Sequence, residues 1–167
     1  MIKYIKTLII LLMVAVILGI VIALVYPSNE EYKNEYSANE LYTKVENSFF
    51  TEGGVKILEE DIILEFVDKI PEYIEDYVVV KANNAKNINE VGIFKVDGKN
   101  SNEMKSIIEK YVINLQKSYR AMDYFPEEIE KIDGARIKVF GNYVIYSFLN
   151  EKDSDAFYKA IKNTLIK

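Results

Sequence analysis

The longest apolar run of the chain lies near its beginning. From Leu8 to Val25, eighteen consecutive residues carry no charge. A helix of that length spans about 27 Å, close to the hydrocarbon thickness of a bilayer. The pattern predicts an uncleaved transmembrane signal-anchor over residues 1–27. A cleaved signal peptide is the alternative, but the apolar run is longer than such peptides usually have and no clear small-residue cleavage site follows it.

The charges on either side of the apolar run predict its orientation. Lys3 and Lys6 precede it, whereas the first charges after it are Glu30 and Glu31. Because positive charges stay on the cytoplasmic side, the N-terminus is expected in the cytoplasm. The protein is then expected to be a single-pass protein of the cell membrane, with the remainder of the chain extracellular.

Apolar residues at three- and four-residue spacing predict four helices after this segment. They cover residues 37–49, 59–70, 101–122 and 152–165. The first begins with a capping box formed by Ser37 and Glu40. In the third, the predicted buried stripe consists of Met104, Ile108, Tyr111, Leu115, Tyr119 and Met122.

Short β-rich runs lie between these helices. Strands are predicted over residues 77–82, 91–96, 135–140 and 143–149. Gly141-Asn142 is a two-residue turn typical of hairpins. The order ααββαββα predicts an α+β fold in which two antiparallel hairpins pack with helices.

The side-chain pattern within the strands predicts their places in the sheet. Residues 77–82 and 143–149 are apolar on both faces and are expected to be inner strands. Residues 135–140 alternate: Arg136 and Lys138 lie on one face, with apolar residues on the other, so this strand is expected near an edge.

Composition limits the chemistry available to the extracellular part. We divide it into a polar tether, residues 28–36, and one domain, residues 37–167. There is no cysteine and no histidine, so thiol chemistry, thiolate metal sites and the commonest general base are excluded. We expect no cofactor and no metal. The chain after residue 27 has a net charge of −7 and no basic patch, so nucleic acid is not an expected partner.

The stretch "SYRAMDYFPEE", residues 118–128, is the most unusual part of the domain. It contains Arg120, one of only two arginines. Arg120 is predicted to lie on the solvent face in the last turn of its helix, where a cation interacts favourably with the helix dipole. Pro126 with the carboxylates after it is typical of the first turn of a short helix. A structural role therefore accounts for this stretch better than an active site.

Other candidate motifs are weak. "EED" at 59–61 is most simply an acidic helix start, and paired carboxylates cannot be placed at catalytic separations from one sequence. "DGKNSN" at 97–102 fails as a calcium loop because Lys99 occupies a ligand position. No serine precedes a lysine in the S-x-x-K arrangement.

Several short runs, taken in order, resemble a known family. These are "EVGIFKV" (90–96), "LQKSY" (115–119), "YFPEE" (124–128) and "ARIKVFGNYVIYSF" (135–148), followed by a terminal amphipathic helix. Together they resemble the domain-of-unknown-function family numbered 4358, of clostridia and related Firmicutes, from about Leu41 to Lys162. The resemblance implies a membrane-anchored or lipoprotein-like extracytoplasmic protein, and it implies no reaction, cofactor or catalytic residue. This chain lacks the lipoprotein cysteine.

Two functions remain as hypotheses. One is a membrane-tethered binding or scaffold domain of the cell envelope, with an envelope protein or a second copy as partner. The other is a small envelope enzyme that uses carboxylates and tyrosines. For the first, the candidate partner surface consists of Tyr124, Phe125, Arg136 and Lys138. Charged edge strands usually resist pairing, which is the alternative explanation of the two cations.

Overall fold

The computed structural model describes residues 31–49, 55–57, 71–83, 86–123 and 125–167. The chain separates into two units, Met1–Glu31 and Tyr32–Lys167. The predicted signal-anchor and the predicted helix over 59–70 lie outside the described residues. Within the described part of the chain, no helix is both long enough and apolar enough to cross a membrane.

The second unit contains a five-stranded sheet built from the described residues, in the order β1-β2-β3-β5-β4, with every neighbouring pair antiparallel. The strands are β1 (Val55–Ile57), β2 (Ile74–Lys81), β3 (Glu90–Val96), β4 (Arg136–Phe140) and β5 (Tyr143–Phe148). The two predicted hairpins, β2–β3 and β4–β5, meet along β3 and β5. β2 and β5 are inner strands and β4 is an edge strand, as predicted. β1 was not predicted and occupies the other edge.

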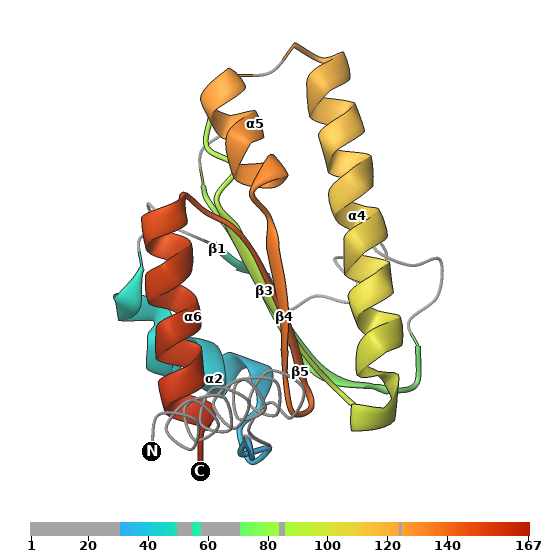
Figure 1. Cartoon of the computed structure of the whole chain (residues 1–167), viewed down its shortest axis with the longest axis vertical. Coiled ribbons are helices and arrows are strands. Elements are labelled where there is room, and N and C mark those ends of the chain that lie inside the picture. Colours follow the sequence, from blue (N-terminus) through green and yellow to red (C-terminus); the bar gives the residue numbers. More distant parts are fainter. Residues whose placement is uncertain (1–30, 50–54, 58–70, 84–85, 124) are drawn as a thin grey trace, which may run out of the picture. The chain divides into compact units, whose positions relative to one another are not determined.

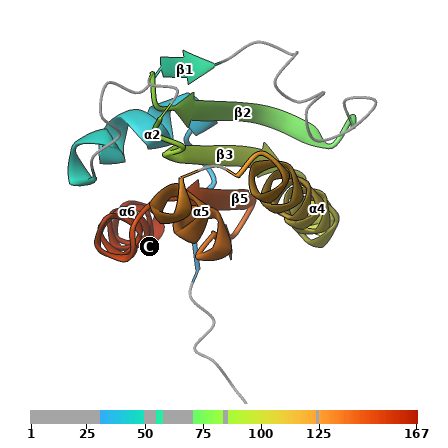
Figure 2. The ribbon, with the colours of Figure 1, turned by 90° about the horizontal axis from the view of Figure 1, so that it is seen from above.

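Helices cover both faces of the sheet (Figures 1 and 2). They are α2 (Ala38–Val45), α4 (Ser101–Ala121), α5 (Pro126–Asp133) and α6 (Glu151–Leu165). α2 and α6 pack on one face, and α4 with α5 on the other. The fold is therefore α+β, as predicted, with a sheet between two helical layers.

This layering follows from the apolar character of the inner strands. All six residues of β5 are buried. Tyr143 and Ile145 belong to the core under α2 and α6, whereas Val144, Tyr146 and Phe148 belong to the core under α4. Since successive side chains of a strand point to opposite faces, a strand that is apolar at every position requires a cover on each side.

The predicted stripe of α4 is only partly right. Met104, Ile108 and Tyr111 are buried, but Leu115 is only half-buried and Met122 is 62% exposed. At about 1.5 Å per residue, this 21-residue helix is roughly 31 Å long. It extends past the sheet, with α5 beside its far half (Figure 1). The C-terminal part of the stripe therefore has less surface to pack against.

The chain enters the second unit as an ordered segment. Tyr32 forms an antiparallel bridge with Ile166, and Lys33 N–H donates to the carbonyl of Leu165 at 2.7 Å. The ring of Tyr32 packs edge-on against that of Phe140, with 5.4 Å between centroids. The residues from Tyr32 onward in the predicted polar tether thus pack with the folded domain.

Candidate functional site

The open side of β4 is one of the two edges of the sheet. β4 pairs with β5 on one side and is the last strand in the sheet order. Lys138 is exposed and Val139 is 38% exposed, while Arg136 and Ile137 are half-buried. These four residues are called the β4 edge surface below. Their side chains are at least partly exposed along this edge of the sheet.

The register determines which backbone groups of β4 point outward. Val96 N–H donates to the carbonyl of Asn142 at 2.9 Å, so the backbone groups of the next residue, Tyr143, point towards β4. Tyr143 is paired with Phe140, and alternate residues back along β4 bond β5 in the same way. The amide and carbonyl groups of Ile137 and Val139 therefore point away from the sheet.

Both cations of the β4 edge surface lie against α6. The guanidinium of Arg136 donates to the carboxylate of Asp155, and this hydrogen bond raises the pKa of Arg136. Lys138 Nζ lies 4.8 Å from the centroid of the Tyr158 ring. The hydroxyl of Tyr158 donates to the carbonyl of Arg136 at 2.6 Å, and burial raises the pKa of this phenol. α6 therefore holds both cationic side chains on one face of the strand.

The predicted partner surface is brought together only in part. Arg136 and Lys138 share one face of β4, as the alternation predicted. Phe125 is the N-cap of α5 and is 42% exposed, and the length of α5 separates it from β4. Tyr124 lies outside the described residues. Thus the two cations form one surface, and Phe125 belongs to a different part of the molecule.

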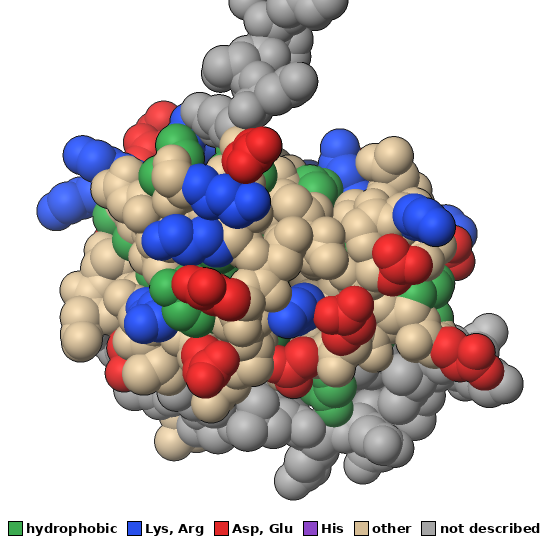
Figure 3. Space-filling model, turned by 90° about the horizontal axis from the view of Figure 1, so that it is seen from below, with side chains coloured by type: hydrophobic (Ala, Val, Ile, Leu, Met, Phe, Trp, Pro, Cys, Tyr) green, Lys and Arg blue, Asp and Glu red, His purple; other side chains and the backbone are tan. Residues whose placement is uncertain are grey.

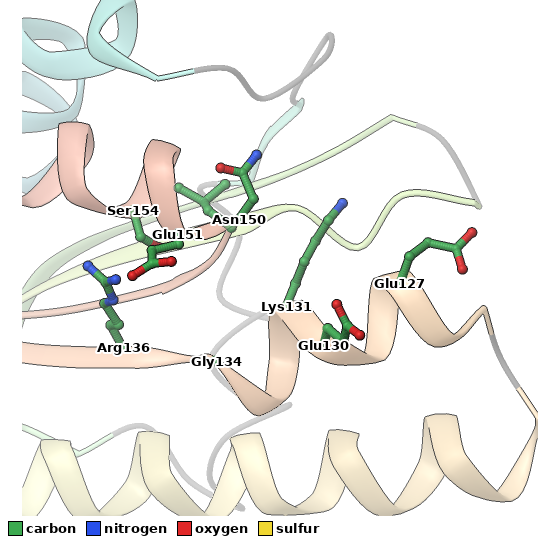
Figure 4. Close-up of a pocket in the computed structure, with 9 residues that line it drawn as sticks. Glu127, Glu130, Lys131, Gly134, Arg136, Asn150, Glu151 and Ser154 are labelled. Atoms are coloured by element: carbon green, nitrogen blue, oxygen red, sulfur yellow. The ribbon is translucent and has the colours of Figure 1, made fainter.

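A cleft of about 480 Å³ lies beside the start of β4 (Figure 4). Its walls come from α5, β4 and the N-terminus of α6; they include Glu127, Glu130, Lys131, Arg136, Asn150, Glu151 and Ser154. The two cations are engaged by carboxylates: Lys131 bonds Glu128, and Arg136 bonds Asp155. The remaining carboxylates make the cleft acidic. Sequence reasoning missed it because its residues come from three separate elements.

A second polar cluster lies inside the core beneath α4. The carboxylate of Glu90, which is 5% exposed, accepts hydrogen bonds from Tyr111 at 3.0 Å and from Tyr146 at 2.5 Å. Lys81 Nζ lies 3.5 Å from its other oxygen. Gly92 leaves room for the Tyr146 ring, since a Cβ there would lie 2.0 Å from Cε1. Glu90 shares one face of β3 with Gly92 and Phe94, and this alternation was the signal in the sequence that the glutamate points inward.

Arg120 has the structural role that its position predicted. Its guanidinium is 58% exposed and donates two hydrogen bonds of 2.7 Å to the carboxylate of Asp133. Asp133 is the last residue of α5, so this pair links the ends of two helices. Glu128, expected at the acidic start of α5, is 8% exposed, and its carboxylate accepts the N–H of Ile88 at 2.9 Å. Both groups position α5.

The comparisons with known proteins identify a family. The model of a domain of unknown function, DUF4358, matches residues 70–149. This match confirms the predicted resemblance over residues 70–149, a region that contains β2 to β5 and the Glu90 cluster. No curated protein and no solved structure matches the chain.

Proposed function

We propose that this protein is a membrane-tethered, extracytoplasmic binding domain of the cell envelope. The N-terminal apolar run, preceded by Lys3 and Lys6, supports a single-pass anchor with a cytoplasmic N-terminus. The rest of the chain then lies outside the membrane. The partner is an envelope protein, bound by a surface rather than transformed in an active site.

The open, outward-facing edge of β4 is the observation that carries this proposal. Exposed sheet edges bind extended segments by backbone hydrogen bonds, and side-chain positions add specificity. Ile137 and Val139 offer two donors and two acceptors in one row. The inner strands β2, β3 and β5 have a paired strand on both sides, so their backbone groups bond within the sheet.

The position at which the chain enters the domain is compatible with tethering. Tyr32 bridges to Ile166, and a Cβ at Gly141 in the β4–β5 turn would lie 3.2 Å from Tyr32 Cβ. Viewed from below in Figure 1, the molecule shows lysines and arginines interspersed with carboxylates (Figure 3). A surface of mixed sign does not favour adsorption onto an anionic leaflet.

Location is tested by cysteine labelling, for which the cysteine-free chain is already suited. Lys3→Cys and Lys117→Cys are introduced separately into the full chain in intact cells; Lys117 is exposed on α4. An impermeant maleimide should label Lys117→Cys alone, and both variants should react after lysis. Labelling of Lys3→Cys alone in intact cells contradicts the proposed orientation.

Binding is tested in the same cells with a photo-reactive amino acid. Replacement of Val139 places the reactive group on the β4 edge surface, and replacement of Lys117 places it on the outer face of α4. The proposal predicts a discrete cross-linked band from position 139 that is much weaker from position 117. Equal cross-linking from both positions shows that this edge is not the binding surface.

A small carboxylate-and-tyrosine enzyme is the second candidate, and the Glu90 cluster is what favours it. A carboxylate with two phenols and a lysine nearby is a set capable of proton transfer. However, Tyr146 is fully buried and Tyr111 is 6% exposed, so a substrate cannot reach their hydroxyls in this conformation. The hydrogen bonds among them satisfy groups that burial would otherwise leave unpaired. The binding domain is therefore the better-supported function.

A further inference from the structure

The β4 edge surface has two chemically different sides. Arg136 and Lys138 project on the side of α6, and Ile137 and Val139 project on the side of α4. A strand added to this edge would place alternate side chains on the same two sides, because side chains alternate along every strand. The residues on one side would meet Lys138 and the ion pair of Arg136 with Asp155, and those on the other would meet apolar side chains.

We propose that the β4 edge takes up, by strand addition, an extended segment of a partner protein in which carboxylate residues alternate with apolar residues. This rests on the proposed binding function and specifies its partner. Lys138 is the main selecting charge, because the guanidinium of Arg136 is already shared with Asp155. The Tyr158 ring positions the Lys138 ammonium on the face of β4 where the carboxylates of the partner segment would lie.

Charge disfavours a second copy of this chain as the occupant. Antiparallel pairing of two β4 strands about Lys138 places the two lysines opposite each other. Pairing about Ile137 places Arg136 opposite Lys138 twice. Like charges directly opposite across two strands are destabilising, whereas opposite charges contribute favourably. The cations therefore disfavour self-pairing in these two registers, whereas they attract an acidic strand in either.

The backbone also sets a requirement that can be tested by itself. Val139 N–H points to the open side, so proline at this position removes a donor needed by an added strand and leaves the bonds to β5 intact. Val139→Ala keeps the donor and is the matched control. Lys138→Glu reverses the selecting charge, and Lys117→Glu makes the same change on the exposed side of α4.

The experiment measures peptide affinity for the full chain in mild detergent by fluorescence anisotropy. The probes are two labelled ten-residue peptides, one alternating glutamate and valine and the other alternating lysine and valine. Wild type should bind the glutamate peptide at least about fivefold more tightly than the lysine peptide, and Lys138→Glu should reverse this preference. Val139→Pro should weaken the binding of both peptides by about tenfold or more, because an added strand would lose one backbone donor and meet the proline ring. Val139→Ala and Lys117→Glu should keep the wild-type preference.

Three results overturn the inference. In the first, wild type binds neither peptide or binds both equally. In the second, Lys138→Glu behaves like Lys117→Glu. In the third, sedimentation shows a dimer that Val139→Pro dissociates, and a second copy is then the occupant. If Val139→Pro does not fold, the reversal by Lys138→Glu still decides the case. A chain that binds the glutamate peptide but fails the labelling test refutes the tethered location and not the edge chemistry.

Discussion

A Cβ atom at Gly92 would lie 2.0 Å from Cε1 of Tyr146, because these two residues face each other across β3 and β5. Tyr146 is fully buried and its hydroxyl is bonded to Glu90, so the ring has no free space to move into. Gly92→Ala should therefore cost about 3 kcal/mol or more, at or above the usual range for overpacking a core. Urea denaturation of the purified chain measures this loss.

Gly134→Ala is the matched control, since its Cβ would meet the carbonyl oxygen of Glu130 at 3.2 Å and the site is exposed. It should cost less than about 1 kcal/mol. Equal losses for the two variants would show that Gly92 is not a packing requirement of Tyr146.

The next prediction concerns α4, where burial falls along the helix. Ile108→Ala should cost about 2–5 kcal/mol, as for a fully buried side chain, and Leu115→Ala clearly less because Leu115 is half-buried. Arg120→Ala should cost under about 1 kcal/mol because its ion pair with Asp133 is exposed. Denaturant midpoints rank the three. A loss at Leu115 equal to that at Ile108 would mean that the end of α4 is better covered than it is in this structure.

Much of the fold could be predicted from the sequence, because the strong signals were local. The capping box of Ser37 and Glu40 is present, with bonds of 3.1 and 2.7 Å, and α2 begins after it. The alternation of Arg136 and Lys138 with apolar residues placed β4 at an edge. These features depend on neighbours along the chain, so one sequence suffices to indicate them.

The features that were missed depend on contacts between distant elements. β1 has three residues and carries little periodic signal. Met122 continues the helical spacing of apolar residues, but that spacing does not indicate where the sheet beneath the helix ends. The partners of Glu90 come from β2, α4 and β5, so its inward position was visible in the alternation of β3 and its hydrogen bonds were not.

The third prediction concerns alkaline pH. Tyr143 donates its hydroxyl proton to the carbonyl of Tyr36 at 2.8 Å, and burial raises the pKa of Tyr143 to about 12 from the ordinary 10.0. Because the folded pKa is the higher one, this stabilisation is complete below pH 10 and is lost as the pH rises through about 12. Unfolding free energies across this range should fall less steeply for Tyr143→Phe than for wild type.

Ile108→Ala on α4, which removes no phenol, is the control and should keep the wild-type slope. If the two variants respond to pH in the same way, the ionisation of Tyr143 does not contribute to alkaline unfolding.

The fourth prediction concerns the segment at which the chain enters the domain. Replacing Tyr32–Tyr36 with a glycine-serine segment of equal length removes the ring contact with Phe140 and the bond from Asn142 N–H to the Asn34 side chain. The loss should be about 2 kcal/mol or more, the sum expected for such contacts. Thermal unfolding of the full chain measures it. An unchanged midpoint would mean that the segment is a passive tether.

The central claim, that β4 presents an open backbone edge, is tested most directly by amide hydrogen exchange in the full chain. Lys138 and Phe140 bond β5, whereas Ile137 and Val139 point outward. Their amides should therefore alternate, with Lys138 and Phe140 exchanging at least about a hundredfold more slowly than Ile137 and Val139. Equally slow exchange of all four amides would contradict the account, because the edge would then already be covered.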